Sequence, residues 1–177
     1  MYKRILVGLD DGETAEALFE RAVTLAQVSD ASLLLMSVLV PPDYLQSPMA
    51  FPAEGAEESD SYIGVDESVW SVYQSLYKNY ELRDLKRLET FLERANAAGV
   101  TAEISQRSGS PGRAICDRAK DWKADLIMVG SHGRTGISEM MLGSVSNHVT
   151  HHAGCSVLVV HDLVISHRDE RALSPVR

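Results

Sequence analysis

Short apolar runs alternate along the chain with longer segments whose apolar residues recur every three or four positions. The run at residues 4–9 is rich in residues typical of buried strands, and residues 31–40 and 124–130 are largely apolar. An apolar run without alternation is typical of a strand covered on both faces of a sheet. Residues 101–107 alternate weakly and predict a more exposed strand, and residues 156–161 predict a final strand.

Helical periodicity fills the intervals between these runs. Residues 13–28 carry an apolar stripe with polar residues between its members, which predicts an amphipathic helix. Ser110 followed by Pro111 is a strong start signal for another helix, because proline suits the first helical position. Residues 144–153 predict a short helix before the final strand.

A longer helix is predicted from about Asp66 until the chain approaches Gly99, a residue type that commonly ends helices. This helix leads into the strand at 101–107. Its predicted buried side comprises Tyr73, Leu76, Tyr77, Tyr80, Leu85, Leu88, Leu92 and Ala95.

The order of these elements alternates strand and helix from one end to the other. Such an order predicts the α/β class, here a single domain with an open, mostly parallel five-stranded sheet and helices on both faces. Ligands of such folds bind outside the carboxyl ends of the strands, where the strand order reverses. That rule indicates three places: Asp10, Val38–Val40 and the glycine-rich segment after Val129.

Residues 41–66 interrupt the pattern with four prolines and an acidic string of small residues. We interpret them as a long loop inserted into the domain, because so polar a segment buries too little apolar surface to form a second one. Residues 162–177 read as a polar C-terminal tail, which leaves 1–161 as the domain.

Composition and charge exclude several classes of function. A net charge of −8 and a pI near 5.2 argue against binding nucleic acid through a basic surface. No apolar run approaches the roughly 18 residues of a membrane span. The two cysteines form no C-x-x-C pair, which fits a reducing compartment, and the N-terminus enters a strand without a cleavable signal. We therefore expect a cytoplasmic protein.

The segment at 130–144 reads GSHGRTGISEMMLGS and is glycine-rich where a phosphate loop would lie. It matches neither the G-x-x-x-x-G-K-S/T loop nor the dinucleotide pattern G-x-G-x-x-G. Its own pattern is Gly130-x-x-Gly133, nine residues, then Gly143-Ser144 at the start of the predicted helix. Glycines alone are equally consistent with a connection that needs them to turn.

The same pattern also suits a nucleotide. Gly130 allows the backbone to approach a ribose closely, and Gly133 allows a turn with positive φ. Gly143, Ser144 and Val145 place backbone N–H groups at a helix N-terminus, where anions bind well. Two further residues of the segment are candidate ligand contacts, His132 to phosphate or ribose and Arg134 to phosphate; His132 could instead only fix the loop.

At this point most of residues 1–161 resembles the universal stress proteins. The resemblance rests on three stretches and on the order of elements. The pattern G-x2-G-x9-G-S/T is typical of the ATP-binding branch of that family, and it is intact here. The three stretches read ILVGLD, ADLIMVGSHGRTG and LGSVSNHVTHHAGCSVLVV.

The resemblance implies a site for ATP or another adenine nucleotide. It places Asp10 beside the adenosine, Val38 in the wall of the adenine pocket, and Val129 and Gly130 against the adenine and ribose. The phosphates would then be held by Gly133, Gly143, Ser144, Val145 and Ser146.

The chain departs from the family after the first strand. Universal stress proteins often have Asp-Gly-Ser or Asp-x-Ser there, whereas this chain has Asp10-Asp11-Gly12. The missing hydroxyl and the added charge of Asp11 predict either weaker binding of a polyphosphate or a need for a divalent ion such as Mg²⁺. Asp10 has an alternative role as a cap of the following helix.

The resemblance implies a nucleotide-dependent regulator or sensor in the stress response, with a regulatory protein as a partner. One alternative is a slow Mg²⁺-dependent ATPase or phosphotransferase that uses Asp10, Asp11 or His132. The absence of a phosphate-loop lysine and of a placed general base limits it to weak hydrolysis. The other alternative is an interaction module that binds no nucleotide and docks a partner through 41–66.

Two further expectations concern assembly and metals. Related proteins dimerise, and the strand at 156–161 would suit antiparallel pairing with its copy. His148, His151 and His152 share one face of their helix. They have no acidic or cysteine ligand beside them, so we assign no metal site.

Overall fold

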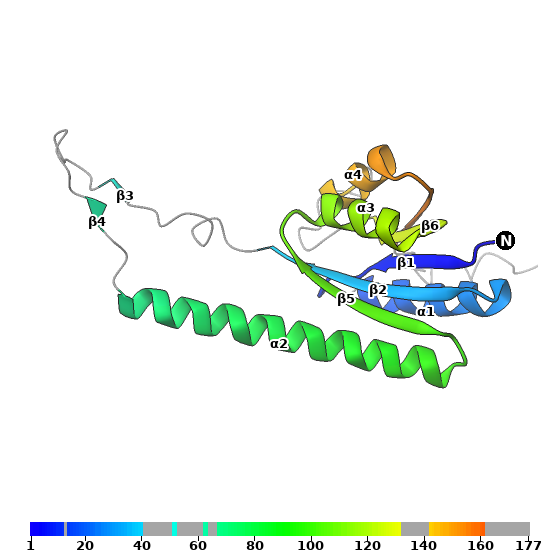
Figure 1. Ribbon diagram of the computed structural model, residues 1–177, viewed down its shortest axis with the longest axis horizontal. Coiled ribbons are helices and arrows are strands. Elements are labelled where there is room, and N and C mark those ends of the chain that lie inside the picture. Colours follow the sequence, from blue (N-terminus) through cyan, green and yellow to red (C-terminus); the bar gives the residue numbers. More distant parts are fainter. Residues whose placement is uncertain (13, 41–50, 53–61, 64–66, 132–141, 162–177) are drawn as a thin grey trace, which may run out of the picture.

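Five parallel strands form one sheet in the order β5-β2-β1-β6-β7 (Figure 1). The computed structural model describes all residues except 13, 41–50, 53–61, 64–66, 132–141 and 162–177. The predicted α/β class with five strands is confirmed, and every pairing in this sheet is parallel. The strands are β1 (Arg4–Gly8), β2 (Ser32–Leu39), β5 (Ala102–Ser108), β6 (Leu126–Gly130) and β7 (Ser156–Val160).

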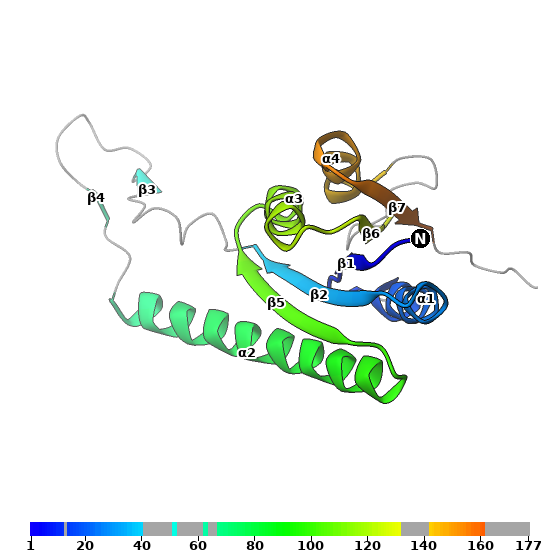
Figure 2. The ribbon, with the colours of Figure 1, turned by 45° about the vertical axis from the view of Figure 1, so that its right-hand side comes forward.

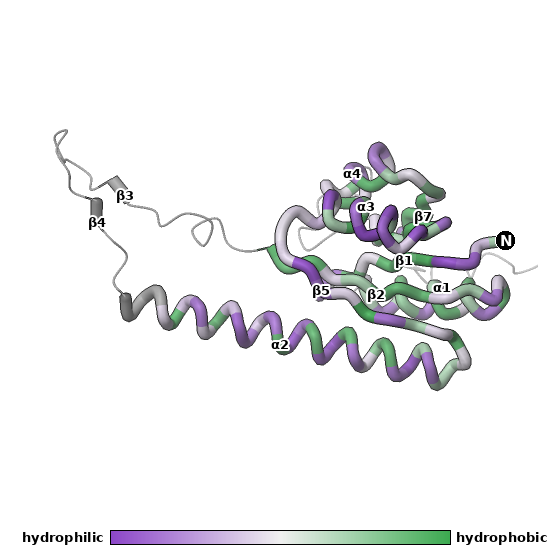
Figure 3. Tube along the Cα trace, viewed as in Figure 1, coloured by the Kyte–Doolittle hydropathy of each residue, from purple (hydrophilic) through white to green (hydrophobic). Residues whose placement is uncertain are grey.

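The helices cover both faces of the sheet (Figures 1 and 2). Because successive residues of a strand point to opposite faces, Ile5 and Val7 pack with α1 and α2, whereas Leu6 packs with α3 and α4. The two resulting cores meet at the sheet, whose central strands form the apolar interior in Figure 3. The helices are α1 (Thr14–Ser29), α2 (Glu67–Ala97), α3 (Pro111–Trp122) and α4 (Ser144–His152).

The helix ends follow the local signals in the sequence. Ser110 is the N-cap residue of α3 and Pro111 its first helical residue, although the Ser110 hydroxyl makes no capping bond. Gly99 has a φ of +78°, as expected of a glycine just past the end of α2. These signals are local, and that is why they fix the boundaries without help from the rest of the chain.

The buried side of α2 differs from the predicted one. Among its described side chains, the predicted Leu88 and Ala95 are confirmed as buried, as are Asp84 and Phe91, all in the second half of the helix, whereas Leu76 is 60% exposed. The helix has 31 residues and spans about 46 Å. Strand β2, with 8 residues, spans only about 26 Å. The first half of α2 therefore extends past the sheet (Figures 1 and 2).

The segment 41–66 contains a short antiparallel ladder that the sequence analysis did not predict. It joins β3 (Phe51–Pro52) to β4 (Tyr62–Ile63). This ladder of two residues on each side lies within the segment interpreted as a loop. Their neighbours in that segment, and the predicted tail at 162–177, lie outside the described residues. Within the described part of the chain, no helix has the length and hydrophobicity that crossing a membrane requires.

Candidate functional site

A cavity of about 400 Å³ opens at the carboxyl ends of the strands, beside the point where the strand order reverses between β1 and β6. Its walls come from the ends of β1, β2 and β6, the starts of α1, α3 and α4, and about two turns of α2. Its size lies within the range of roughly 300–1,000 Å³ typical of small-molecule sites. The topology thus brings together the three places that the sequence analysis singled out.

Eight of the eleven predicted site residues line this cavity. The other three, His132, Gly133 and Arg134, lie outside the described residues. The cavity therefore joins segments that are far apart in the sequence. The eight lining residues are Asp10, Val38, Val129, Gly130, Gly143, Ser144, Val145 and Ser146.

One part of the cavity is an apolar slot. Val38 and Val129 line it from the ends of β2 and β6, and Met36 and Ile115 lie beside them. Met36, Ile115 and Val129 belong to the core between the sheet and α3 and α4, so the slot continues the packed interior. Apolar walls with a few polar groups at one end are typical of sites that take a planar, partly polar ligand.

Asp10 shapes the turn that follows β1. Its Oδ1 accepts the backbone N–H of Gly12 at 3.0 Å, and the Gly12 carbonyl accepts the N–H of Ala15 at 3.2 Å. The described carboxylate bond thus closes a turn two residues ahead of α1. Residue 13 lies outside the described residues, so the alternative role of Asp10 as a helix cap stays a prediction.

The N-terminus of α4 faces the cavity through Gly143, Ser144 and Val145. The first N–H groups of a helix have no intrahelical acceptor, and the helix dipole makes this end favourable for an anion. Gly143 is the N-cap residue, with φ −60° and ψ 160°, and it has no side chain to occupy these donors. Within the described residues, no side-chain cap takes up these donors.

Ser146 is placed differently from its neighbours. Its hydroxyl donates to the carbonyl oxygens of Gly143 at 2.9 Å and Ser131 at 3.2 Å, and the residue is buried. The N–H of Gly143 also donates to the Ser131 carbonyl, at 2.7 Å. The Ser146 hydroxyl thus ties the start of α4 to the end of β6, and its recorded bonds are to the protein.

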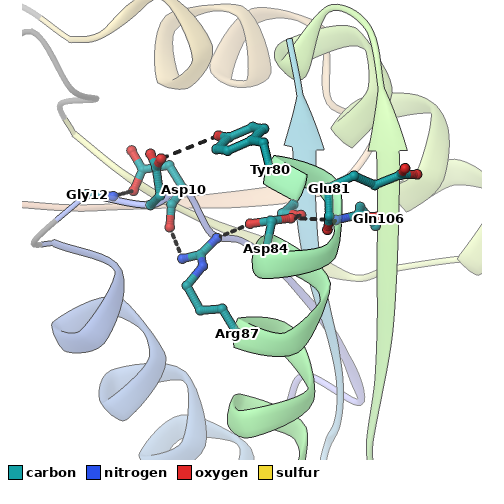
Figure 4. A network of polar contacts seen from close by, with 9 residues as sticks. Asp10, Gly12, Tyr80, Glu81, Asp84, Arg87 and Gln106 are labelled. Carbon is teal, nitrogen blue, oxygen red and sulfur yellow. Dashed lines mark hydrogen bonds and ion pairs between the residues drawn. The ribbon is translucent and has the colours of Figure 1, made fainter. Parts of the chain in front are cut away.

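Helix α2 contributes three cavity residues that the predicted site did not include: Tyr80, Asp84 and Arg87. Figure 4 shows Tyr80 and Arg87 pointing toward the turn after β1, with the Asp84 carboxylate between Arg87 and Gln106. The sequence did carry a signal for the burial of Asp84. Asp84, Leu88, Phe91 and Ala95 are four, three and four residues apart, a helical spacing that puts this carboxylate on the same side as the apolar residues. The sequence analysis assigned Leu85 to that side instead.

Asp84 accepts three hydrogen bonds inside the protein. Ser37 Oγ donates to it, as do Gln106 Nε2 at 2.8 Å and Arg87 at 2.7 Å. Burial raises the pKa of Asp84, but the bonds from Ser37, Gln106 and Arg87 outweigh burial and hold the pKa below its ordinary value. Asp84 is therefore a carboxylate at neutral pH.

The described lining of the cavity is acidic. It contains Asp10, Asp11 and Asp84 but only Arg87 as a cation, and that guanidinium already pairs with Asp84. Tyr80 donates its hydroxyl to Asp11 at 3.3 Å. Phosphate binding within this part of the chain would rest on backbone N–H groups, and the carboxylates suit a divalent cation.

The described histidines and the two cysteines are not among the residues that line the cavity. His148 stacks on His152 with ring centroids 4.1 Å apart. Among the described residues, no group of three or more His, Cys, Asp or Glu side chains has the arrangement of a metal site. Burial raises the pKa of both Cys116 and Cys155, so their thiols are weak nucleophiles at neutral pH.

Comparisons with known proteins agree with this geometry. Universal stress protein Sll1388 of Synechocystis sp. is 33% identical over 159 residues, which cover 90% of this chain and 97% of that protein. The solved structure of hypothetical protein MJ0577 shares the fold, with a TM-score of 0.72, 24% identity and coverage of 91% of this chain and 96% of that one. A universal stress protein solved in complex with cAMP has a TM-score of 0.54 and 25% identity, and the match covers 90% and 97%.

The family pattern itself spans the whole described sheet. Residues 1–161 match the Universal stress protein family, from the start of the chain through the end of β7. The match includes every strand and helix around the cavity. The chain belongs to the universal stress protein family.

Proposed function

We propose that this protein binds an adenine nucleotide in the cavity at the carboxyl ends of β1, β2 and β6, and that the bound nucleotide regulates a stress response. The observation that carries the proposal is the convergence of the apolar slot, Asp10 and the open N-terminus of α4 on one cavity. The solved relative in complex with cAMP supports the choice of an adenine nucleotide.

The chemistry of the lining suggests how the ligand would lie. The adenine would enter the slot between Val38 and Val129, and Asp10 would accept a hydrogen bond from the adenosine. The phosphates would meet the first N–H groups of α4. Mg²⁺ prefers oxygen ligands, so the carboxylates of Asp10 and Asp11 suit an ion that accompanies ATP.

Replacing Ser144 by proline tests the phosphate contact. Proline removes one N–H at the first position of α4, and the extended backbone of Gly143 already suits a residue that precedes proline. We expect Ser144→Pro to weaken ATP binding about tenfold, the loss of one charge-assisted hydrogen bond, and Ser144→Ala to weaken it less. Titration calorimetry with AMP, ADP, ATP and cAMP, each with and without Mg²⁺, measures both.

Two results would count against the proposal. If the unmodified protein neither retains an adenine nucleotide through gentle purification nor binds an added one, the proposed function is wrong. If Ser144→Pro and Ser144→Ala lose the same affinity, the hydroxyl and not the backbone N–H holds the phosphate.

We also propose a homodimer that pairs through the last strand. Strand β7 is at the edge of the sheet, and Leu158 on it is 41% exposed. Leu25 of α1, which is half-buried, lines a groove together with Leu158 and Val160, so apolar surface adjoins this edge, on which no further strand pairs within the described residues. Such a dimer would act in the cytoplasm and signal its nucleotide state to a regulatory protein.

Charge at this edge tests the dimer. Leu158→Glu places a carboxylate in the proposed interface, so we expect sedimentation velocity to show a shift from dimer to monomer. Leu76→Glu on the projecting part of α2 adds the same charge at another exposed leucine, one that is 60% exposed, and should leave the dimer intact. A protein that sediments as a monomer before any substitution would contradict this proposal.

A further inference from the structure

Arg87 joins α2 to the turn that follows β1. One guanidinium nitrogen pairs with the Asp84 carboxylate at 2.7 Å, and another donates to the backbone carbonyl of Asp10. Figure 4 shows the two bonds leaving the guanidinium in different directions. The Arg87 side chain thus holds the backbone of Asp10, which lies 77 positions away in the sequence.

The guanidinium is itself held in place from two strands. Asp84 receives Ser37 from β2 and Gln106 from β5 in addition to Arg87. Gln106 donates to the carbonyl of Glu81 as well, at 3.0 Å, which fixes this turn of α2 on the sheet. The Asp84 side chain is only 5% exposed and that of Arg87 25%, so the surrounding protein restricts the movement of both.

Within the described residues, the other hydrogen bonds at the turn lie on the Asp10 carboxylate, Gly12 and Asp11. Asp10 and Asp11 lie after the end of β1 and before the start of α1. The bond from the Gly12 N–H to Asp10 Oδ1 closes the turn from within, and Tyr80 reaches Asp11 from α2. Arg87 is the group that fixes the carbonyl of Asp10 itself.

We infer that Arg87 is a positioning residue for nucleotide binding, which fixes the Asp10–Gly12 turn and so aims the Asp10 carboxylate into the cavity. The inference rests on the proposed function. The alternative is a direct contact between Arg87 and the nucleotide. The observation behind that alternative is the Arg87 Nε, which is buried and has no acceptor within the described residues. A guanidinium that bound phosphate directly would act by charge, whereas a positioning guanidinium acts by its geometry.

The first test compares two arginines of the same helix. Arg94 pairs with Glu16 and Glu20 of α1, lies over Phe19 and is not among the cavity residues. We expect Arg87→Met to weaken ATP binding about tenfold in titration calorimetry. Arg94→Met removes the same charge and should change the affinity less than about twofold. Equal losses in both variants would overturn the inference.

Two further variants separate positioning from direct contact. Arg87→Lys keeps the charge but loses the planar fork, so we expect it to bind ATP as weakly as Arg87→Met. If Arg87 acts through Asp10, the double variant Asp10→Ala with Arg87→Met should bind no more weakly than Asp10→Ala alone. Restored binding in Arg87→Lys, or additive losses in the double variant, would overturn the positioning role.

A measurement without ligand distinguishes this inference from the proposed function. We expect the Gly12 amide to exchange with solvent faster in Arg87→Met than in the unmodified protein, because the turn loses its tie to α2. Arg94→Met should leave that exchange unchanged. Unchanged exchange in Arg87→Met would overturn the inference even if nucleotide binds, whereas a failure of the unmodified protein to bind any nucleotide would overturn the proposed function.

Discussion

Asp84→Ala is expected to lower the free energy of unfolding by about 3 kcal/mol, the range found when one partner of a buried ion pair is removed. The substitution leaves three donors without their acceptor: the Ser37 hydroxyl, the Gln106 amide and the Arg87 guanidinium. The expected loss is at the lower end of that range because Arg87 is partly exposed and water can reach it. Urea denaturation followed by circular dichroism measures it.

Glu89→Ala is the matched control for this prediction. Glu89 lies on the same helix but is exposed, so removing its charge should change the stability by no more than about 0.5 kcal/mol. If Asp84→Ala and Glu89→Ala have the same stability, the network around Asp84 contributes nothing to folding.

The same carboxylate gives this stability a pH dependence. The pKa of Asp84 lies below its ordinary value in the folded protein, since its hydrogen bonds outweigh burial. The unfolded chain therefore binds a proton first as the pH falls. The contribution of Asp84 is complete above the unfolded pKa of about 3.9 and is lost as the pH falls through the lower folded pKa. The stability difference between the unmodified protein and Asp84→Asn should thus shrink below about pH 4.

Gly112→Val is expected to destabilise the protein by about 3 kcal/mol through overpacking between α3 and α4. A Cβ at Gly112 would lie 2.8 Å from the Cβ of His148, closer than side-chain atoms approach. That atom is attached to the backbone of α4, so no rotation of the His148 side chain relieves the contact. The two helices must move apart, at the cost of their packing.

Gly112→Ala should cost less than Gly112→Val, partly because alanine gains about 1 kcal/mol of helix propensity over glycine. Gly154→Val is the control, since a Cβ at Gly154 meets nothing within 4 Å. We expect thermal denaturation to give the lowest melting temperature for Gly112→Val, a higher one for Gly112→Ala and the highest for Gly154→Val. A Gly112→Val protein as stable as the control would contradict the close packing of α3 on α4.

The elements of this fold were predictable because their signals are local. The predicted strand at 4–9 became Arg4–Gly8, and the helix signalled by Ser110 and Pro111 begins where proline fits. Apolar runs and capping residues act through neighbours a few positions away. The strand ends also foretold where a cavity would form, since parallel strands place their carboxyl ends at one edge.

The residues of α2 at the site could not be placed in this way. Helix periodicity narrows the buried side of α2 to a stripe, but the end of the sheet decides which half of that stripe is covered, and this left Leu76 exposed and Asp84 buried. The role of the Ser146 hydroxyl was hidden for a related reason, because its acceptors include the carbonyl of Ser131, fifteen residues away.

The sequence alone was sufficient to establish the alternation of strands and helices, the edge of the sheet where the cavity opens and the glycine pattern of the family. These depend on periodicity, on the chirality of strand connections and on residues adjacent in the chain. The tertiary structure alone revealed the contact of Arg87 with Asp10, the burial of Asp84 and the close approach of α3 to α4 at Gly112. Each of these joins segments far apart in the sequence, and their contact depends on how the helices settle on the sheet.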